Sequence, residues 1–159
     1  MIIRTATPED AASVAEIWNA IIRDTARTFT TQEKTVDGIE ADILSRKDAF
    51  IVAEIEKVVV GFATYFPFRS GPGYAYTMEH SVNIREHVWG RGVGRALMAR
   101  LEEVARVNNV HSLIAGVSGE NSDGVNFHKA IGYAEVARLP AVGRKFDRWM
   151  DLILLQKFL

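Results

Sequence analysis

Residues 88–107 read VWGRGVGRALMARLEEVARV, in which three glycines at alternate positions lead directly into a helical pattern. A single glycine at such a turn indicates only backbone geometry, because glycine tolerates positive φ. Three of them, Gly90, Gly92 and Gly94, leave successive backbone N–H groups unobstructed at the positive end of the helix dipole, which favours phosphate oxygens. Arg91 and Arg95 add two guanidinium groups suited to phosphate. The stretch therefore predicts a phosphate site in preference to a plain turn.

Two common nucleotide motifs do not fit this stretch. A P-loop requires a lysine after its last glycine, and none follows here. A dinucleotide fingerprint requires a third glycine at the position where Leu97 stands. The phosphate-bearing ligand is therefore expected to be of another kind.

The rest of the chain alternates between strand and helix patterns. Thr7 and Pro8 begin a first helix that carries Val14 and Ile17 inward, and Gly132 ends a last helix that starts at Asn121 or Ser122. A second helix is expected at 36–46 and a third after the glycine turn. Strands are expected at 2–6, 49–56, 58–68, 76–86, 111–118, 133–138 and 146–157. This order predicts a mixed α/β domain with helices packed on a central sheet, the middle block of strands being antiparallel.

Composition limits the partners of the protein. The chain has 159 residues, 48% hydrophobic and 25% charged, with a formal net charge of −1. That balance predicts one globular domain that attracts neither nucleic acid nor membranes, and the N-terminal residues show no signal peptide, so a cytoplasmic protein is expected. The absence of cysteine excludes disulfides, thiolate metal sites and a cysteine nucleophile. His80, His87 and His111 show no metal-ligand spacing, so no metal site is expected.

A second motif, NSDGVNFHKAIGY at residues 121–133, follows the glycine stretch. Together the two stretches resemble the acetyl-CoA-binding core of the GCN5-related N-acetyltransferase (GNAT) superfamily, and the resemblance covers essentially residues 1–159. It implies a single GNAT domain with a mixed, mostly antiparallel central sheet flanked by about four helices. The family's pyrophosphate pattern, [QR]-x-x-G-x-[GA], can be placed in two registers: with Gly92 and Gly94 as its small residues, Trp89 departs from the first position, whereas Arg91, Gly94 and Ala96 satisfy all three positions.

The resemblance also implies where acetyl-CoA binds. The backbone of the strand after Glu79 is expected to pair with the pantetheine arm, and Asn121 either binds that arm or serves only as a helix cap. The expected cofactor-binding residues are Val82, Ile84, Arg91, Gly92, Val93, Gly94, Arg95, Ala96, Asn121 and Phe127.

Within the superfamily, the segments YTMEHSVNI, FHKAIGY and VGRKFDRWMDL resemble the phosphinothricin and methionine sulfoximine acetyltransferase branch. This implies a small-molecule acceptor, the α-amino group of a glutamate-like amino acid. The branch also implies a homodimer, in which the apolar segment LILL (152–155) is either an interface strand or a core strand.

Acetyl transfer to an amine requires a base, because the amine is mostly protonated at neutral pH. Without cysteine, direct attack on the thioester is expected. Glu79 is the expected base: alternation places it with Ser81 and Asn83 on an unusually polar strand face, although an isolated glutamate would more often face solvent. His128 stands where most of the superfamily has the tyrosine that protonates the CoA thiolate, and histidine there could act as acid or second base.

The acceptor carboxylate requires a cation, and the branch resemblance assigns Arg69 to it. Phe29, Tyr74 and Tyr76 are expected to wall the pocket, and Lys145 is a further cationic candidate. Two other functions stay open from the sequence. One is acetylation of a different amine, such as a polyamine or a protein N-terminus, and the other is a non-catalytic acyl-CoA sensor that needs neither catalytic residue.

Overall fold

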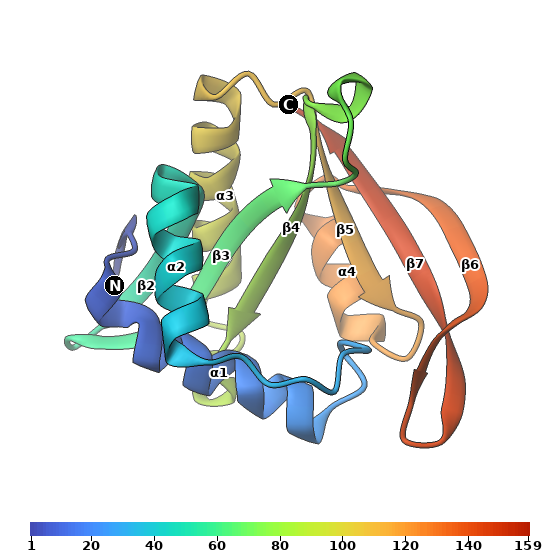
Figure 1. Cartoon of the computed structure of the whole chain (residues 1–159), viewed down its shortest axis with the longest axis horizontal. Coiled ribbons are helices and arrows are strands. Elements are labelled where there is room, and N and C mark those ends of the chain that lie inside the picture. Colours follow the sequence, from blue (N-terminus) through green and yellow to red (C-terminus); the bar gives the residue numbers. More distant parts are fainter.

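A seven-stranded sheet with the order β1-β2-β3-β4-β5-β7-β6 forms the centre of the computed structural model, which describes residues 1–159 (Figure 1). The strands are β1 (Ile2–Thr5), β2 (Phe50–Ile55), β3 (Val58–Pro67), β4 (Thr77–Ile84), β5 (Ser112–Ser118), β6 (Ala134–Lys145) and β7 (Arg148–Phe158). The helices are α1 (Ala11–Asp24), α2 (Val36–Arg46), α3 (Val93–Val107) and α4 (Ser122–Ala130). None of the four is long and apolar enough to span a membrane.

Two hydrophobic cores lie on opposite faces of this sheet. Because strand side chains alternate, Phe50 and Phe62 point to one face and pack with α1 and α2, while Ile51 and Ala63 point to the other and pack with α3. Leu97, on α3, is fully buried in this second core. Figure 1 shows the corresponding layers, with α1 and α2 in front of the sheet and α3 and α4 behind it.

Strands β4 and β5 are the only parallel neighbours in the sheet, and they separate part-way along their length. They pair only from Thr77 to His80 on β4, opposite Ser112 to Ala115 on β5. Beyond these residues β4 continues to Ile84 and β5 to Ser118 without pairing. The facing edges of two central strands are therefore left open at the end of the sheet where α3 begins.

The structure confirms the expected fold class and the order of elements. The 36–46 helix has the predicted bounds, and the three strands of the middle block are antiparallel. One strand was predicted too short: β6 continues from 138 to Lys145. Pro140 and Gly143 disguise this continuation in the sequence, but the pairing with β7 absorbs them in a register shift between Leu139 and Gly143.

Candidate active site

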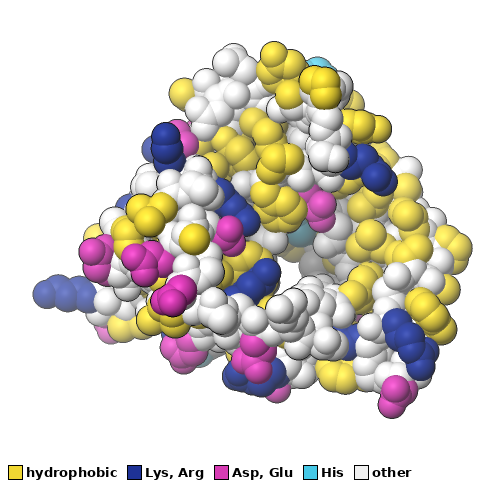
Figure 2. Space-filling model, in the orientation of Figure 1, with side chains coloured by type: hydrophobic (Ala, Val, Ile, Leu, Met, Phe, Trp, Pro, Cys, Tyr) yellow, Lys and Arg dark blue, Asp and Glu magenta, His cyan; other side chains and the backbone are white.

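The opening between β4 and β5 is the floor of a cleft of about 640 Å³, and Figure 2 shows the corresponding hollow on this face. The unpaired parts of β4 and β5 contribute from below, the α1–α2 segment from one side, and α4 with the glycine turn from the other. The residues that line the cleft include Trp18, Arg27, Lys34, Glu79, His80, Ser81, Val82, Asn83, Ile84, Trp89, Gly94, Gly116, Asn121, Asp123, Phe127 and His128.

The alternation of β4 divides this cleft into two halves. Val82 and Ile84 pack against the core on the α3 side. Glu79, Ser81 and Asn83, at the intervening positions, point to the α1 side. The cleft therefore has an apolar half beside the α3 N-terminus and a polar half beneath the α1–α2 segment, joined through the gap between the strands.

Glu79 lies in the polar half, half-buried and without an ion-pair partner. Its Oε1 atom lies over Gly116 of β5, where an added Cβ would be only 3.0 Å away. Burial raises the pKa of the Glu79 carboxyl above its ordinary value. The side chain is thus a carboxylate of increased basicity beside the strand gap.

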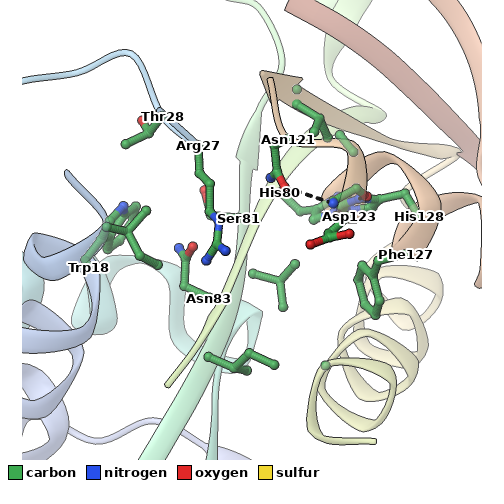
Figure 3. Close-up of a pocket in the computed structure, with 18 of the residues that line it drawn as sticks. Trp18, Arg27, Thr28, His80, Ser81, Asn83, Asn121, Asp123, Phe127 and His128 are labelled. Atoms are coloured by element: carbon green, nitrogen blue, oxygen red, sulfur yellow. Dashed lines mark hydrogen bonds between the residues drawn. The ribbon is translucent and has the colours of Figure 1, made fainter. Parts of the chain in front are cut away.

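His80 and His128 form a buried pair on the other side of β4. Their Nε2 atoms are 3.0 Å apart, and Nδ1 of His128 lies 2.7 Å from the carbonyl oxygen of Gly124 (Figure 3). Since a carbonyl only accepts, Nδ1 of His128 is the protonated nitrogen, and in neutral His128 the Nε2 atom must accept a hydrogen bond. His80 therefore donates from its Nε2.

Both imidazoles are held in the neutral form. Burial, helped by the neighbouring His128, lowers the pKa of His80 to about 3, and burial also lowers the pKa of His128. The ring of Tyr133 packs edge-on against both histidines. In this arrangement both ring nitrogens of His128 are engaged, so its release of a proton into the cleft requires one of these hydrogen bonds to break.

The glycine turn has the geometry of an open anion cradle. Gly90 and Gly92 have φ of +72° and +79°, which favour glycine, and an added Cβ at either would meet no atom within 4 Å. Gly92 is the N-cap of α3 and supplies no side-chain cap, so the first N–H groups of the helix stay open. Arg91 and Arg95 are exposed beside them.

The remaining residues assigned to the cofactor lie around this turn. Val93 and Gly94 are buried at the start of α3, and Ala96, in the same first turn, is half-buried. An added Cβ on Gly94 would lie 3.2 Å from the Phe127 ring, so Gly94 allows close contact between α3 and α4. Asn121 caps α4, its side chain accepting a hydrogen bond from the Gly124 N–H at 3.0 Å, and it also lines the cleft.

The residues assigned to the acceptor lie outside the cleft. Arg69, Tyr74 and Tyr76 are exposed in and after the β3–β4 loop, with Arg69 over the ring of Phe68. The Phe29 ring instead fills the space beside Gly143 of β6, which has no Cβ.

Lys145 is also directed elsewhere. It is buried, and its ammonium donates to the carbonyls of Ile22, Thr25 and Thr28 at 2.6, 2.7 and 3.1 Å. Burial lowers the pKa of this group. The interactions tie the β6–β7 hairpin to the last turn of α1 and to the segment that follows it, which makes Lys145 an anchor for one wall of the cleft.

Several cleft residues were missed at the sequence level. Arg27 lies in a polar connecting segment that carries no regular pattern, and His80 is 48 positions away from its partner His128. Gly116 occupies an otherwise apolar strand. Trp89 was noticed only because it departs from the cofactor-loop pattern, and in the structure its indole lies at the mouth of the cleft.

Comparison with known proteins agrees with this geometry. A family model described as "Acetyltransferase (GNAT) domain" matches residues 3–154. The chain belongs to the GNAT family of acetyltransferases. Among members of this family, the L-amino acid N-acyltransferase MnaT of Escherichia coli K12 is 36% identical, over 98% of this chain and 92% of the relative.

A curated relative and a solved structure, both from Salmonella typhimurium, are similarly related. The L-methionine sulfoximine/L-methionine sulfone acetyltransferase is 35% identical over 98% of this chain and 93% of its own. The solved structure of yncA, a putative acetyltransferase with its cofactor acetyl-CoA, superimposes with a TM-score of 0.95 at 34% identity, covering 100% of this chain and 94% of that one. The GNAT fold therefore extends over the whole chain, including both halves of the cleft.

Proposed function

We propose that this protein transfers the acetyl group of acetyl-CoA to the α-amino group of a small amino acid, of the type represented by methionine sulfoximine and phosphinothricin. The observation that carries the proposal is one cleft that joins an open, glycine-lined helix N-terminus to the half-buried carboxylate of Glu79. Relatives named for acylation of L-amino acids and of methionine sulfoximine support this choice of acceptor.

The apolar half of the cleft suits acetyl-CoA. The open N–H groups at Gly92, Val93 and Gly94 would hold the pyrophosphate, with Arg91 and Arg95 as flanking cations and Ala96 on the first turn. This assignment does not depend on which side-chain register of the loop applies, because the backbone supplies the donors.

The pantetheine arm would follow the strand gap. The unpaired edge of β4 at Val82 and Ile84 offers backbone groups to the arm, as a neighbouring strand would. Asn121 and Phe127 lie on the opposite wall. The thioester would then reach the gap through which the two halves of the cleft communicate.

Glu79 serves as the base in this proposal. It accepts a proton from the acceptor ammonium, directly or through a water molecule, so that the amine lone pair can attack the thioester carbonyl and expel the CoA thiolate. A pKa raised by burial makes Glu79 a stronger base than an exposed glutamate.

The proton for the departing thiolate is assigned to His128. This role requires His128 first to take up a proton from solvent on Nε2, which breaks the hydrogen bond from His80, and then to pass that proton to the thiolate, because loss of the Nδ1 proton from the neutral ring would leave an imidazolate. The His128 contribution is therefore expected to be smaller than that of Glu79, which faces the acceptor without a competing partner.

The protein would act as a homodimer in the cytoplasm. Ile153 and Leu155 of the LILL segment are buried in the chain's own core. The exposed apolar residues Val142, Phe146 and Trp149 at the β6–β7 hairpin are therefore better candidates for the interface. Sedimentation equilibrium at micromolar concentration tests this part of the proposal.

Release of CoA thiol from acetyl-CoA, measured with a panel of amines, tests the function. The panel contains L-methionine sulfone, L-methionine sulfoximine, phosphinothricin, spermidine and a peptide with a free N-terminal alanine. The proposal predicts turnover on one or more of the three amino acids at the α-nitrogen, identified by the mass of the product. Turnover only on spermidine or on the peptide would contradict it, and acetyl-CoA binding without turnover on any amine would indicate a sensor.

A further inference from the structure

Arg27 is a cation in the acceptor half of the cleft that has no ion-pair partner and no side-chain hydrogen bond in the protein. It lies in the segment between α1 and α2, half-buried, and Figure 3 shows its guanidinium end directed toward Ser81 and Asn83 of β4. Most arginines of the chain reach a carboxylate within 4 Å, but Arg27 forms neither an ion pair nor a side-chain hydrogen bond. Its five donors are therefore available to a ligand.

Trp89 holds Arg27 at this place. The Cζ atom of Arg27 lies 4.4 Å from the centroid of the Trp89 ring, and the indole N–H of Trp89 donates to the carbonyl of Ile84 at 3.2 Å, which fixes the ring. The guanidinium lies over the Trp89 ring and donates to no protein acceptor, so its N–H groups stay free for a planar anion. The tryptophan that departs from the cofactor-loop pattern thus becomes a platform for a cation on the acceptor side.

The charges around the cleft explain why such a cation is needed. Glu79 and Asp123 are both acidic and line the cavity without ion-pair partners, so they would disfavour an anionic acceptor. Lys34, the other cation of the lining, is exposed and lies 4.8 Å from the Trp18 ring centroid. Arg69, the cation assigned from the sequence, is exposed on the loop before β4 and outside the cavity.

We propose that Arg27, stacked on Trp89, binds the α-carboxylate of the acceptor and so restricts the enzyme to free amino acids; this inference rests on the proposed function. A bidentate carboxylate–guanidinium pair fixes two oxygens of the acceptor and leaves its amino group in the half of the cleft that contains Glu79. Polyamines and peptide N-termini lack a carboxylate at that position, because the peptide has an amide there. Specificity for the free acid is then a property of one side chain.

The test compares L-methionine sulfone with its α-carboxamide as acceptors, using CoA release as the readout. Wild type is expected to prefer the acid, and Arg27→Met is expected to lower kcat/KM for the acid by about 10- to 100-fold, the value of charge-assisted hydrogen bonds. The carboxamide rate and the KM for acetyl-CoA should stay within about twofold. Arg27→Lys keeps the charge without the bidentate fork, so its kcat/KM for the acid should lie between those of wild type and Arg27→Met.

Arg23→Met is the matched control, since Arg23 lies four residues earlier at the end of α1, is paired with Glu33 at the surface and does not line the cleft. It should retain the wild-type ratio of acid to carboxamide. An unchanged ratio in Arg27→Met, with the wild type active on the acid, would overturn the assignment of Arg27 and leave the proposed function standing. A wild type that acetylates acid and carboxamide equally would also overturn it. A wild type that acetylates no free amino acid would refute the proposed function and this inference with it.

Discussion

Replacing Gly92 by valine should weaken acetyl-CoA binding more than it lowers the stability of the fold. Gly92 has φ of +79°, a conformation that costs a β-branched residue about 1–3 kcal/mol. No atom lies within 4 Å of the added Cβ, so no packing clash adds to this cost. For a domain of this size, the melting temperature should therefore fall by roughly 2–12 °C.

The effect on acetyl-CoA should be larger than the effect on stability. The new side chain occupies the open space in front of the first N–H groups of α3, where the pyrophosphate is expected to lie. Loss of one charge-assisted hydrogen bond at about 1.5–3 kcal/mol corresponds to a Kd increased by about 10- to 150-fold. Isothermal titration calorimetry measures this Kd for acetyl-CoA, at a temperature well below the melting point of the variant.

Gly71→Val is the matched control for this experiment. Gly71 has φ of +108°, and an added Cβ there would meet only Tyr74, at 4.0 Å, in a loop outside the cleft. The control has similar backbone strain without a change in the cradle, so its acetyl-CoA affinity should equal that of wild type. If Gly92→Val binds acetyl-CoA as tightly as Gly71→Val does, the backbone cradle at the α3 N-terminus is refuted.

Three further predictions concern titration and buried polar groups. The acid limb of the profile of kcat/KM against pH should have its midpoint above pH 4.5, because burial raises the pKa of Glu79. A midpoint at or below pH 4.5 would argue against Glu79 as the base. Lys145→Met should lower the free energy of unfolding by about 2–4 kcal/mol in urea titrations, since one buried and two partly buried carbonyls lose their donor, and an unchanged midpoint would show that the anchor is dispensable. His80 and His128 have pKa values that are lowered in the folded protein, so the unfolded chain binds more protons than the folded one below pH 6.5. The free energy of unfolding should therefore fall as the pH drops from 6.5 to 5, by up to about 1.4 kcal/mol per pH unit for each histidine. His80→Phe should flatten that slope in thermal melts, and an equally steep slope would contradict the neutral pair.

The order of elements could be predicted from the sequence because local patterns determine it. The apolar periodicity of α3 and the glycines before it lie within one 20-residue stretch, and Gly132, which follows the Ile131 C-cap with φ of +97°, ends α4 as expected. β6 was predicted too short because Pro140 and Gly143 are residue types that are typical of turns and uncommon inside strands. Its length depends on pairing with β7, which no local pattern records.

The polar half of the cleft was only partly predictable for the same reason. Glu79 could be identified from strand alternation, which is local. Arg27 could not, because its role depends on Trp89, 62 positions later, approaching it from another element. His80 likewise becomes part of a buried pair only when α4 packs behind β4.

The central claim is that Glu79 is the base of acetyl transfer in this cleft, and single-turnover kinetics of Glu79→Gln test it most directly. Enzyme saturated with acetyl-CoA is mixed with L-methionine sulfone, and N-acetyl product is followed by quenched flow and mass spectrometry. Glutamine keeps the shape beside Gly116 but cannot accept the proton, so the rate should fall by about 10²- to 10⁴-fold while the Kd for acetyl-CoA is unchanged. Glu103→Gln, on the exposed face of α3, should react at the wild-type rate. A Glu79→Gln rate within about threefold of wild type would contradict the account.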